Sequence, residues 1–171
     1  RRRLLGVDHP DTLESANNLA ANLYELGQYE QARLLSEDTL TRRRRVLGED
    51  HPHTLNSANN LAINLYELDQ YELARLLDDD TLARRRRVLG EDHSATLTTA
   101  CSFARNLCAL GHHEQARQLQ LDTLTRMRRV LGRHTAGAAV AVVRPGPVAP
   151  ATARRVPRRR RRVRRGGLRH Q

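Results

Sequence analysis

The sequence predicts an all-α protein, an α-solenoid of about three stacked antiparallel helix hairpins, on three observations. Gly6, Gly48, Gly90 and Gly132 lie 42 residues apart. Each 42-residue unit contains two stretches in which apolar residues recur every three or four positions, the spacing of an amphipathic helix. A short break separates the two stretches, so each unit is a pair of helices whose apolar faces can be buried only against neighbouring units.

The first unit shows the expected elements in order. The first helix is expected from about Pro10 to Leu26, and the second from about Tyr29 to Leu47, with Gly27 and Gln28 between them. Proline suits the first turn of a helix, and Gly48 stands where a left-handed residue commonly follows a helix. The same order recurs in the second and third units.

A period near 42 residues also fits HEAT-type helical repeats and propeller blades. The propeller is excluded, because the alternation of β-branched and aromatic residues that its strands need is absent. The period alone does not exclude HEAT repeats, so the residue motifs have to decide.

Those motifs resemble tetratricopeptide repeats of the 42-residue kinesin-light-chain type, which also occur in bacterial signalling proteins. The resemblance rests on LGEDHP, NNLA, Gly-Gln-Tyr-Glu-x-Ala and Asp-Thr-Leu, and it covers about residues 4–132. The third unit departs from the pattern, since Cys101, Ser102 and Phe103 replace Asn-Asn-Leu. In the first two units the matching segments are 17–20, 27–32 and 38–40, then 59–62, 69–74 and 80–82. The resemblance implies a right-handed superhelix whose first helices line a concave wall.

One stripe of the first helices is the candidate peptide-binding surface. Asn17, Ala21 and Tyr24 share a helix face at spacings of four and three residues, and the second unit repeats this pattern. Amide side chains both donate and accept hydrogen bonds, so they can bind a peptide backbone, and tyrosine adds apolar area with a polar end. By resemblance these positions lie on the concave wall. The full candidate set is Asn17, Asn18, Ala21, Tyr24, Asn59, Asn60, Ile63, Tyr66 and Arg105.

Two alternatives bear on this assignment. Asn18 and Asn60 could instead satisfy buried backbone groups between repeats. Relatives that hold a C-terminal carboxylate use Lys or Arg on this wall, whereas here Arg105 is the sole basic residue among the candidates. A neutral or weakly basic peptide therefore fits Glu14, Glu25 and Glu67 better.

The arginine runs 42–45 and 84–87 are similar to nucleic-acid-binding patches, but consecutive helical residues point about 100° apart. Each run also follows an acidic residue by four positions, a spacing worth about 0.2–0.5 kcal/mol per ion pair. The pairs are Asp38 with Arg42, Asp80 with Arg84 and Asp122 with Arg126. We interpret the runs as a solvated, internally paired helix surface, with a contact site as the alternative.

His9, His51 and His93 recur at one position in the loop before each first helix. Successive repeats hold them too far apart to share one metal ion, whose bonds to histidine are about 2 Å long. We expect them to cap helices or to pack the loop.

Charge divides the chain into two parts. Of its 171 residues, 30 are arginine and none is lysine, for a formal net charge of +11. Residues 1–132 hold 18 arginines and all 19 acidic residues, while 133–171 hold 12 arginines and no acid. We expect an array over 1–132, in units of about 7–48, 49–90 and 91–132. The Arg/Ala/Pro-rich tail, 133–171, is predicted to be disordered.

Two hypotheses account for the tail. It could be a basic arm that binds nucleic acid or an acidic partner by counterion release. The favoured hypothesis is a shifted reading frame in GC-rich coding DNA, since the change falls abruptly inside a repeat. The other frames would then contain a DHPxTL motif.

These features predict a non-catalytic module that binds a protein or peptide. No paired nucleophile and base, Gly-rich phosphate loop or metal-ligand pattern is found, so no enzyme activity, cofactor or metal is expected. Neither a signal peptide nor an apolar run of about 20 residues is present, which favours the cytoplasm over a membrane. The chain begins with Arg1 and is expected to be a fragment of a larger regulatory or scaffold protein. The alternatives are nucleic-acid binding through the tail and self-association through an uncapped repeat end.

Overall fold

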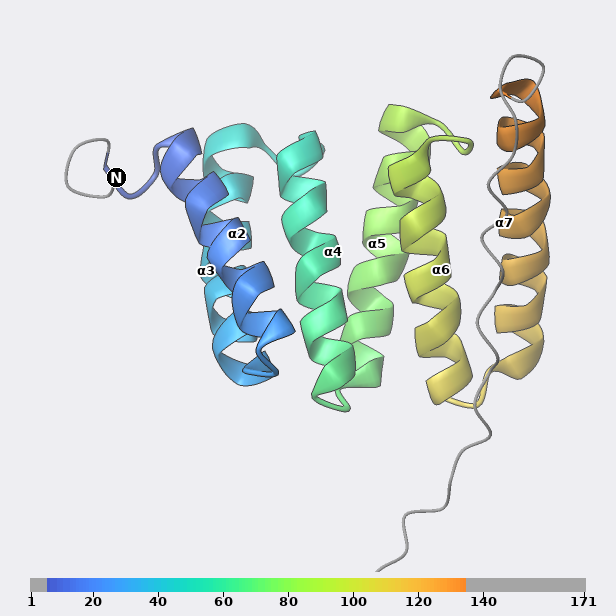
Figure 1. Cartoon of the computed structure of the whole chain (residues 1–171), viewed down its shortest axis with the longest axis horizontal. Helices are drawn as coiled ribbons and strands as arrows, with labels where there is room; N and C mark the ends of the chain where they lie inside the picture. Colours follow the sequence, from blue (N-terminus) through green and yellow to red (C-terminus); the bar gives the residue numbers. More distant parts are fainter. Residues whose placement is uncertain (1–5, 135–171) are drawn as a thin grey trace, which may run out of the picture. The chain divides into compact units, whose positions relative to one another are not determined.

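The computed structural model describes residues 6–134, which form six α-helices standing side by side (Figure 1). The predicted tail lies outside the described residues, apart from its first two positions. No strand occurs within 6–134. The helices are α2 (Pro10–Glu25), α3 (Tyr29–Leu47), α4 (Pro52–Glu67), α5 (Tyr71–Leu89), α6 (Ser94–Ala109) and α7 (His113–His134).

The helices pair as three hairpins, α2–α3, α4–α5 and α6–α7, and each hairpin packs on the next. The first helices also approach one another, because α4 contacts both α2 and α6. Between the second helices α3, α5 and α7, no such contact occurs among the described residues. The array therefore curves toward the first helices, which form its concave side. The all-α solenoid of about three hairpins is confirmed.

Small residues allow the close helix contacts. Ala20, Ala62 and Ala104 are buried on the first helices, and Ala32, Ala74 and Ala116 on the second helices have no exposed surface. Leucines fill the space between hairpins, where a buried cluster joins Leu40 of α3 to Leu61 and Leu65 of α4. A core of alanine and leucine without tryptophan thus suffices, since each inner helix packs against neighbours on both sides.

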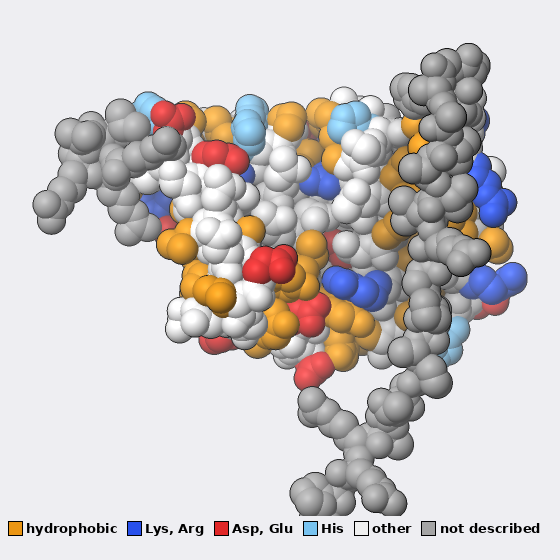
Figure 2. Space-filling view, viewed as in Figure 1, with side chains coloured by type: hydrophobic (Ala, Val, Ile, Leu, Met, Phe, Trp, Pro, Cys, Tyr) orange, Lys and Arg blue, Asp and Glu red, His pale blue; other side chains and the backbone are white. Residues whose placement is uncertain are grey.

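The recurring histidines cap the first helices, as expected. In His9, His51 and His93 the Nδ1 atom accepts a hydrogen bond from the backbone N–H two residues later, at 3.1–3.2 Å. Each side chain thus satisfies one N–H that the helix itself cannot pair. Figure 2 shows histidines along the edge where the first helices begin.

The glycines after the second helices depart from the expected geometry. Gly48 and Gly90 have positive φ, 87° and 89°, but their ψ angles of 164° and 162° are extended rather than left-handed helical. Gly132 lies inside α7, which continues to His134. The first two glycines thus turn the chain toward the next first helix, and Gly132 does not.

The interpretation of the arginine runs as a solvated surface is wrong for one residue in each run, whereas the other three are exposed or partly exposed. Arg42 pairs with Asp38 and with Asp8 of the preceding loop, and Arg84 and Arg126 repeat the arrangement. Arg43 and Arg85, however, are buried rather than solvated. Their guanidinium groups extend to the next first helix, where they donate to the backbone carbonyl oxygens of His53 and Ala95 at 2.8 and 2.7 Å.

Candidate peptide-binding site

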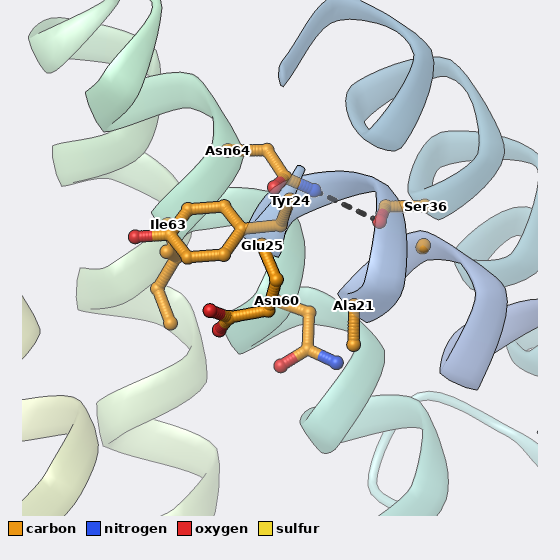
Figure 3. Close-up of a pocket in the computed structure, with 8 residues that line it drawn as sticks. Ala21, Tyr24, Glu25, Ser36, Asn60, Ile63 and Asn64 are labelled. Atoms are coloured by element: carbon orange, nitrogen blue, oxygen red, sulfur yellow. Dashed lines mark hydrogen bonds between the residues drawn. The ribbon is translucent and has the colours of Figure 1, made fainter. Parts of the chain in front are cut away.

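A pocket of about 210 Å³ opens between α2 and α4 on the concave side (Figure 3). Four predicted site residues line it, two from each helix. The pocket is mainly apolar, with amide and carboxylate groups at its edges. Its lining consists of Ala20, Ala21, Tyr24 and Glu25 of α2, Ser36 of α3, and Asn60, Ile63 and Asn64 of α4.

Side-chain size on α2 creates this pocket. Ala20 and Ala21 leave space beside the helix, whereas Tyr24, one turn further along, closes one end with its ring. The ring packs on Tyr29 at a centroid distance of 5.4 Å, and the hydroxyl donates to Glu67 Oε1 at 3.1 Å. Burial, followed by the nearby Glu67 carboxylate, raises the pKa of Tyr24. The hydroxyl therefore stays protonated at neutral pH and links the ends of α2 and α4.

Arg105 occupies the corresponding position between α4 and α6. Its guanidinium carbon lies 4.0 Å from the centroid of the Tyr66 ring, a cation–π contact. Tyr66 in turn packs edge-on against Tyr71 at 5.1 Å. The buried Arg105 Nε has no hydrogen-bond partner within the described part of the chain. Tyr66 of the second unit and Arg105 of the third thus meet in one cluster, with a cation where the first pocket has Ile63.

The asparagines of the predicted stripe bond mainly to each other and to neighbouring repeats. Asn17 Oδ1 accepts from Asn60 Nδ2 at 3.2 Å and from the Ser57 hydroxyl at 3.4 Å. Asn59 accepts from Thr99 at 3.1 Å and is only 7% exposed, which leaves little surface for a ligand. Asn18 is exposed, and Asn60 donates to a side chain rather than to a buried backbone group. Peptide contact by these residues stays a prediction.

A second row of asparagines was missed by the sequence analysis. Asn64 Nδ2 donates to the Ser36 hydroxyl at 3.0 Å at the edge of the pocket, and Asn106 donates to Asp78 at 2.6 Å (Figure 3 shows the first pair). The available signal was the recurrence of asparagine at 22, 64 and 106, of which the last two lie opposite a polar residue of the preceding second helix. These amides lie at the helix interface behind the concave surface.

The acidic residues expected to attract a peptide differ in availability. Glu14 pairs with the buried Arg43 at 2.6 Å, and Glu67 accepts the Tyr24 hydroxyl. Glu25 is exposed at the rim of the pocket. Figure 2 shows acidic and basic side chains close together among apolar ones on the visible face. Glu25 is thus the carboxylate best placed to meet a ligand.

Within 6–134, no three His, Cys, Asp or Glu side chains are grouped so that they could hold a metal ion. Cys101 and Cys108 are exposed free thiols. None of the described helices is both long and apolar enough to cross a membrane.

Comparison with protein families gives one model, described as tetratricopeptide repeat, which matches residues 12–53, 54–95 and 96–136. A comparison with curated protein sequences gave no match.

Solved structures with the same fold include a candidate kinesin light chain of Podosopora anserina with nearly identical TPR-like repeats. Its sequence is 25% identical to this chain, and the two structures superpose with a TM-score of 0.63. The match covers 72% of this chain and 58% of the kinesin light chain structure. A glutamine-to-methionine variant of that protein is also 25% identical and has a TM-score of 0.65. The match covers 73% of this chain and 59% of the variant's chain. BtubC (BKLC) from P. vanneervenii is 17% identical and has a TM-score of 0.65. The match covers 86% of this chain and 57% of BtubC, and at this identity it shows the fold alone. The chain thus spans less than two thirds of each of these structures.

Proposed function

Because the chain belongs to the tetratricopeptide repeat family, we propose that its hairpins form a non-catalytic module that binds a peptide segment or helix of a partner protein on the concave first-helix face. Repeats of this family typically mediate protein–protein interaction. The proposal adds the binding face, its residues and the type of ligand.

The pocket between α2 and α4 is the observation that carries the proposal. It is concave and mainly apolar, and its polar groups lie at the rim, which is the usual composition of a ligand site. Ala21 and Ile63 supply apolar surface, while Tyr24 is fixed by its bond to Glu67. A side chain entering here meets a surface that is already formed, which keeps the entropic cost of binding low.

The lining predicts the chemistry of the ligand. An apolar side chain, such as leucine or a small aromatic residue, fits the pocket, and a neighbouring basic residue can pair with the exposed Glu25. Arg105 stacks on Tyr66 at the next position along the groove, where its guanidinium group can donate hydrogen bonds to a carboxylate or carbonyl oxygen of the ligand. We therefore propose an apolar anchor flanked by a basic residue, with Asn18 and Asn60 beside the peptide backbone.

Selection of displayed random peptides on the full chain tests the proposal. The enriched peptide is then measured against Ala21→Trp, which fills the pocket, and Ala83→Trp, an exposed alanine of α5 outside the pocket. Affinity is expected to fall at least about tenfold for Ala21→Trp, a loss of about 1.4 kcal/mol, and to be unchanged for Ala83→Trp. Fluorescence polarisation gives both dissociation constants.

Equal affinity for the two variants would place the ligand elsewhere and end the groove assignment. Arg105→Ala separates the two parts of the groove, since it removes the cation beside Tyr66 but leaves the first pocket intact. Thermal denaturation confirms that each variant is folded. We also propose that the module is part of a larger cytoplasmic regulatory or scaffold protein.

A second candidate function rests on the composition of residues 133–171, which hold 12 arginines and no acid. This segment would bind nucleic acid through phosphate contacts, with affinity that falls steeply as salt rises. Replacement of Arg158–Arg162 by glutamine in the full chain is expected to flatten the salt dependence of DNA binding. The matched control is the replacement of Arg44 and Arg86, which are exposed in the array, by glutamine.

A further inference from the structure

Two second helices carry an apolar face that the next hairpin covers. Leu40 of α3 packs among alanine and leucine side chains of α4 and is 3% exposed. Leu82, which stands 42 residues later on α5, is 2% exposed. The same position on α7 is Leu124, and it is 49% exposed. Among residues 6–134, the outer face of α7 thus has the residues of an interface, and no further hairpin covers them.

The outer face of α2 is the matching surface. Leu61 of α4, which contacts α3, is 7% exposed, while the equivalent Leu19 of α2 is 52% exposed. Asn64 is buried by its bond to Ser36 of α3, whereas the equivalent Asn22 is exposed. Thus α2 presents to solvent the side chains with which α4 binds α3.

We propose that copies of this chain associate end to end, with α2 of one copy lying on the outer face of α7 of the next. This contact repeats the arrangement in which α4 lies on α3 and α6 lies on α5. Leu124 would lie among Ala16, Leu19 and Leu23 of the second copy, as Leu40 lies among Ala58, Leu61 and Leu65. Asn22 would face Gln120, as Asn106 faces Asp78.

A second copy is the occupant that these faces favour, because their apolar residues are those that pack together at the interface between α3 and α4. Position 127 supports this assignment. Arg43 and Arg85 are buried charges that bond to the next first helix, but the third unit has Met127 at that place. An apolar side chain can be covered by another copy without the desolvation of a charge.

The two faces differ, so the contact is heterologous and does not close a dimer. Association is therefore expected to grow into longer oligomers as concentration rises. The peptide-binding face of the proposed function remains open, because the contact uses the ends of the array. Binding of a peptide and self-association can thus fail independently.

Sedimentation velocity of the full chain tests the proposal from about 10 µM to about 1 mM. Salt of at least 0.15 M limits the reach of the tail arginines to about 8 Å. Leu19→Glu disables the α2 face and Leu124→Glu disables the α7 face. The control is Leu34→Glu, an equally exposed leucine of α3 that lies on neither end. Thermal denaturation confirms that the three variants are folded.

The wild type and Leu34→Glu are expected to form oligomers, and each end variant is expected to be monomeric, with association weakened at least about tenfold. An equimolar mixture of Leu19→Glu and Leu124→Glu is expected to stop at dimers, since one intact face of each kind remains. A monomeric wild type up to about 1 mM overturns the proposal. So does a Leu19→Glu variant that still dimerises alone, which would show α7 packing on α7.

Discussion

The side-chain amide of Asn106 donates a hydrogen bond of 2.6 Å to Oδ2 of Asp78, at a place where the carboxyl group has no exposed surface. The second carboxylate oxygen, Oδ1 of Asp78, has no partner, and neither has Oδ1 of Asn106, within the part of the chain that the structure describes. Burial raises the pKa of Asp78 to about 7, although Asn106, Arg105 and Arg85 lower it. The interface between α5 and α6 therefore contains an acid that titrates near neutral pH.

The contribution of Asp78 to the stability of the array is expected to fall as pH rises from about 4 to about 7. The folded protein holds a proton on Asp78 up to about pH 7, whereas the unfolded chain releases it near the ordinary value of 3.8. The folded state thus binds more protons in this window, and its advantage is lost as pH rises. Urea denaturation across the window measures the change. A difference in the free energy of unfolding between the wild type and Asp78→Asn that stays constant from pH 4 to 7 would contradict it.

Asp78→Asn is expected to stabilise the protein at pH 8 by about 1–3 kcal/mol and to flatten the pH dependence. An asparagine keeps the acceptor for Asn106 and brings an N–H₂ donor for the unpaired Asn106 oxygen, without a charge to desolvate. Asp79→Asn is the control, since Asp79 is exposed. Denaturation midpoints at pH 5 and pH 8 decide the matter: equal effects of the two substitutions would mean that burial of Asp78 has no energetic consequence.

Arg85→Met is expected to destabilise the array by about 2–4 kcal/mol, even though methionine stands at the equivalent position 127. Arg85 donates to the carbonyl oxygens of Leu55 and Ala95 and to the Asn56 side chain, so its loss removes the hydrogen bonds by which α5 is joined to α4 and α6. Arg86→Met, at the exposed neighbouring position, is expected to change stability by less than about 0.5 kcal/mol. Chemical denaturation of both variants distinguishes a structural arginine from a solvated one.

Helix positions were predictable from sequence because each depends on local patterns. The expected second helix, Tyr29 to Leu47, agrees with α3, and the first differs by one residue at its end. The repeated histidines were correctly expected to cap. Helix positions and histidine caps depend on residues that are near one another in the sequence.

Arg43 and Arg85 show what local patterns cannot determine. Adjacent arginines of one run have opposite environments, since Arg42 pairs at the surface and Arg43 is buried. The difference depends on the direction in which the next hairpin packs, about 10 residues further along the chain. The lining of the pocket could not be predicted from helix periodicity alone either, because Ser36 reaches the pocket from a different helix, α3. Four of its residues were nevertheless among the candidates, since they repeat every 42 residues on one helix face.

His51→Ala is expected to cost about 0.5–2 kcal/mol of stability, and His51→Asn to restore most of the loss. His51 Nδ1 accepts a hydrogen bond from the N–H of His53 at 3.2 Å and thereby satisfies a donor at the start of α4. An asparagine side-chain oxygen can accept the same hydrogen bond, whereas alanine has no acceptor. His112→Ala, in an exposed loop before a helix without a histidine cap, is the control. Thermal denaturation of the three variants gives the order of stability. If His51→Asn is no more stable than His51→Ala, the contribution of His51 comes from its ring stacking on His53 at 5.4 Å rather than from the cap.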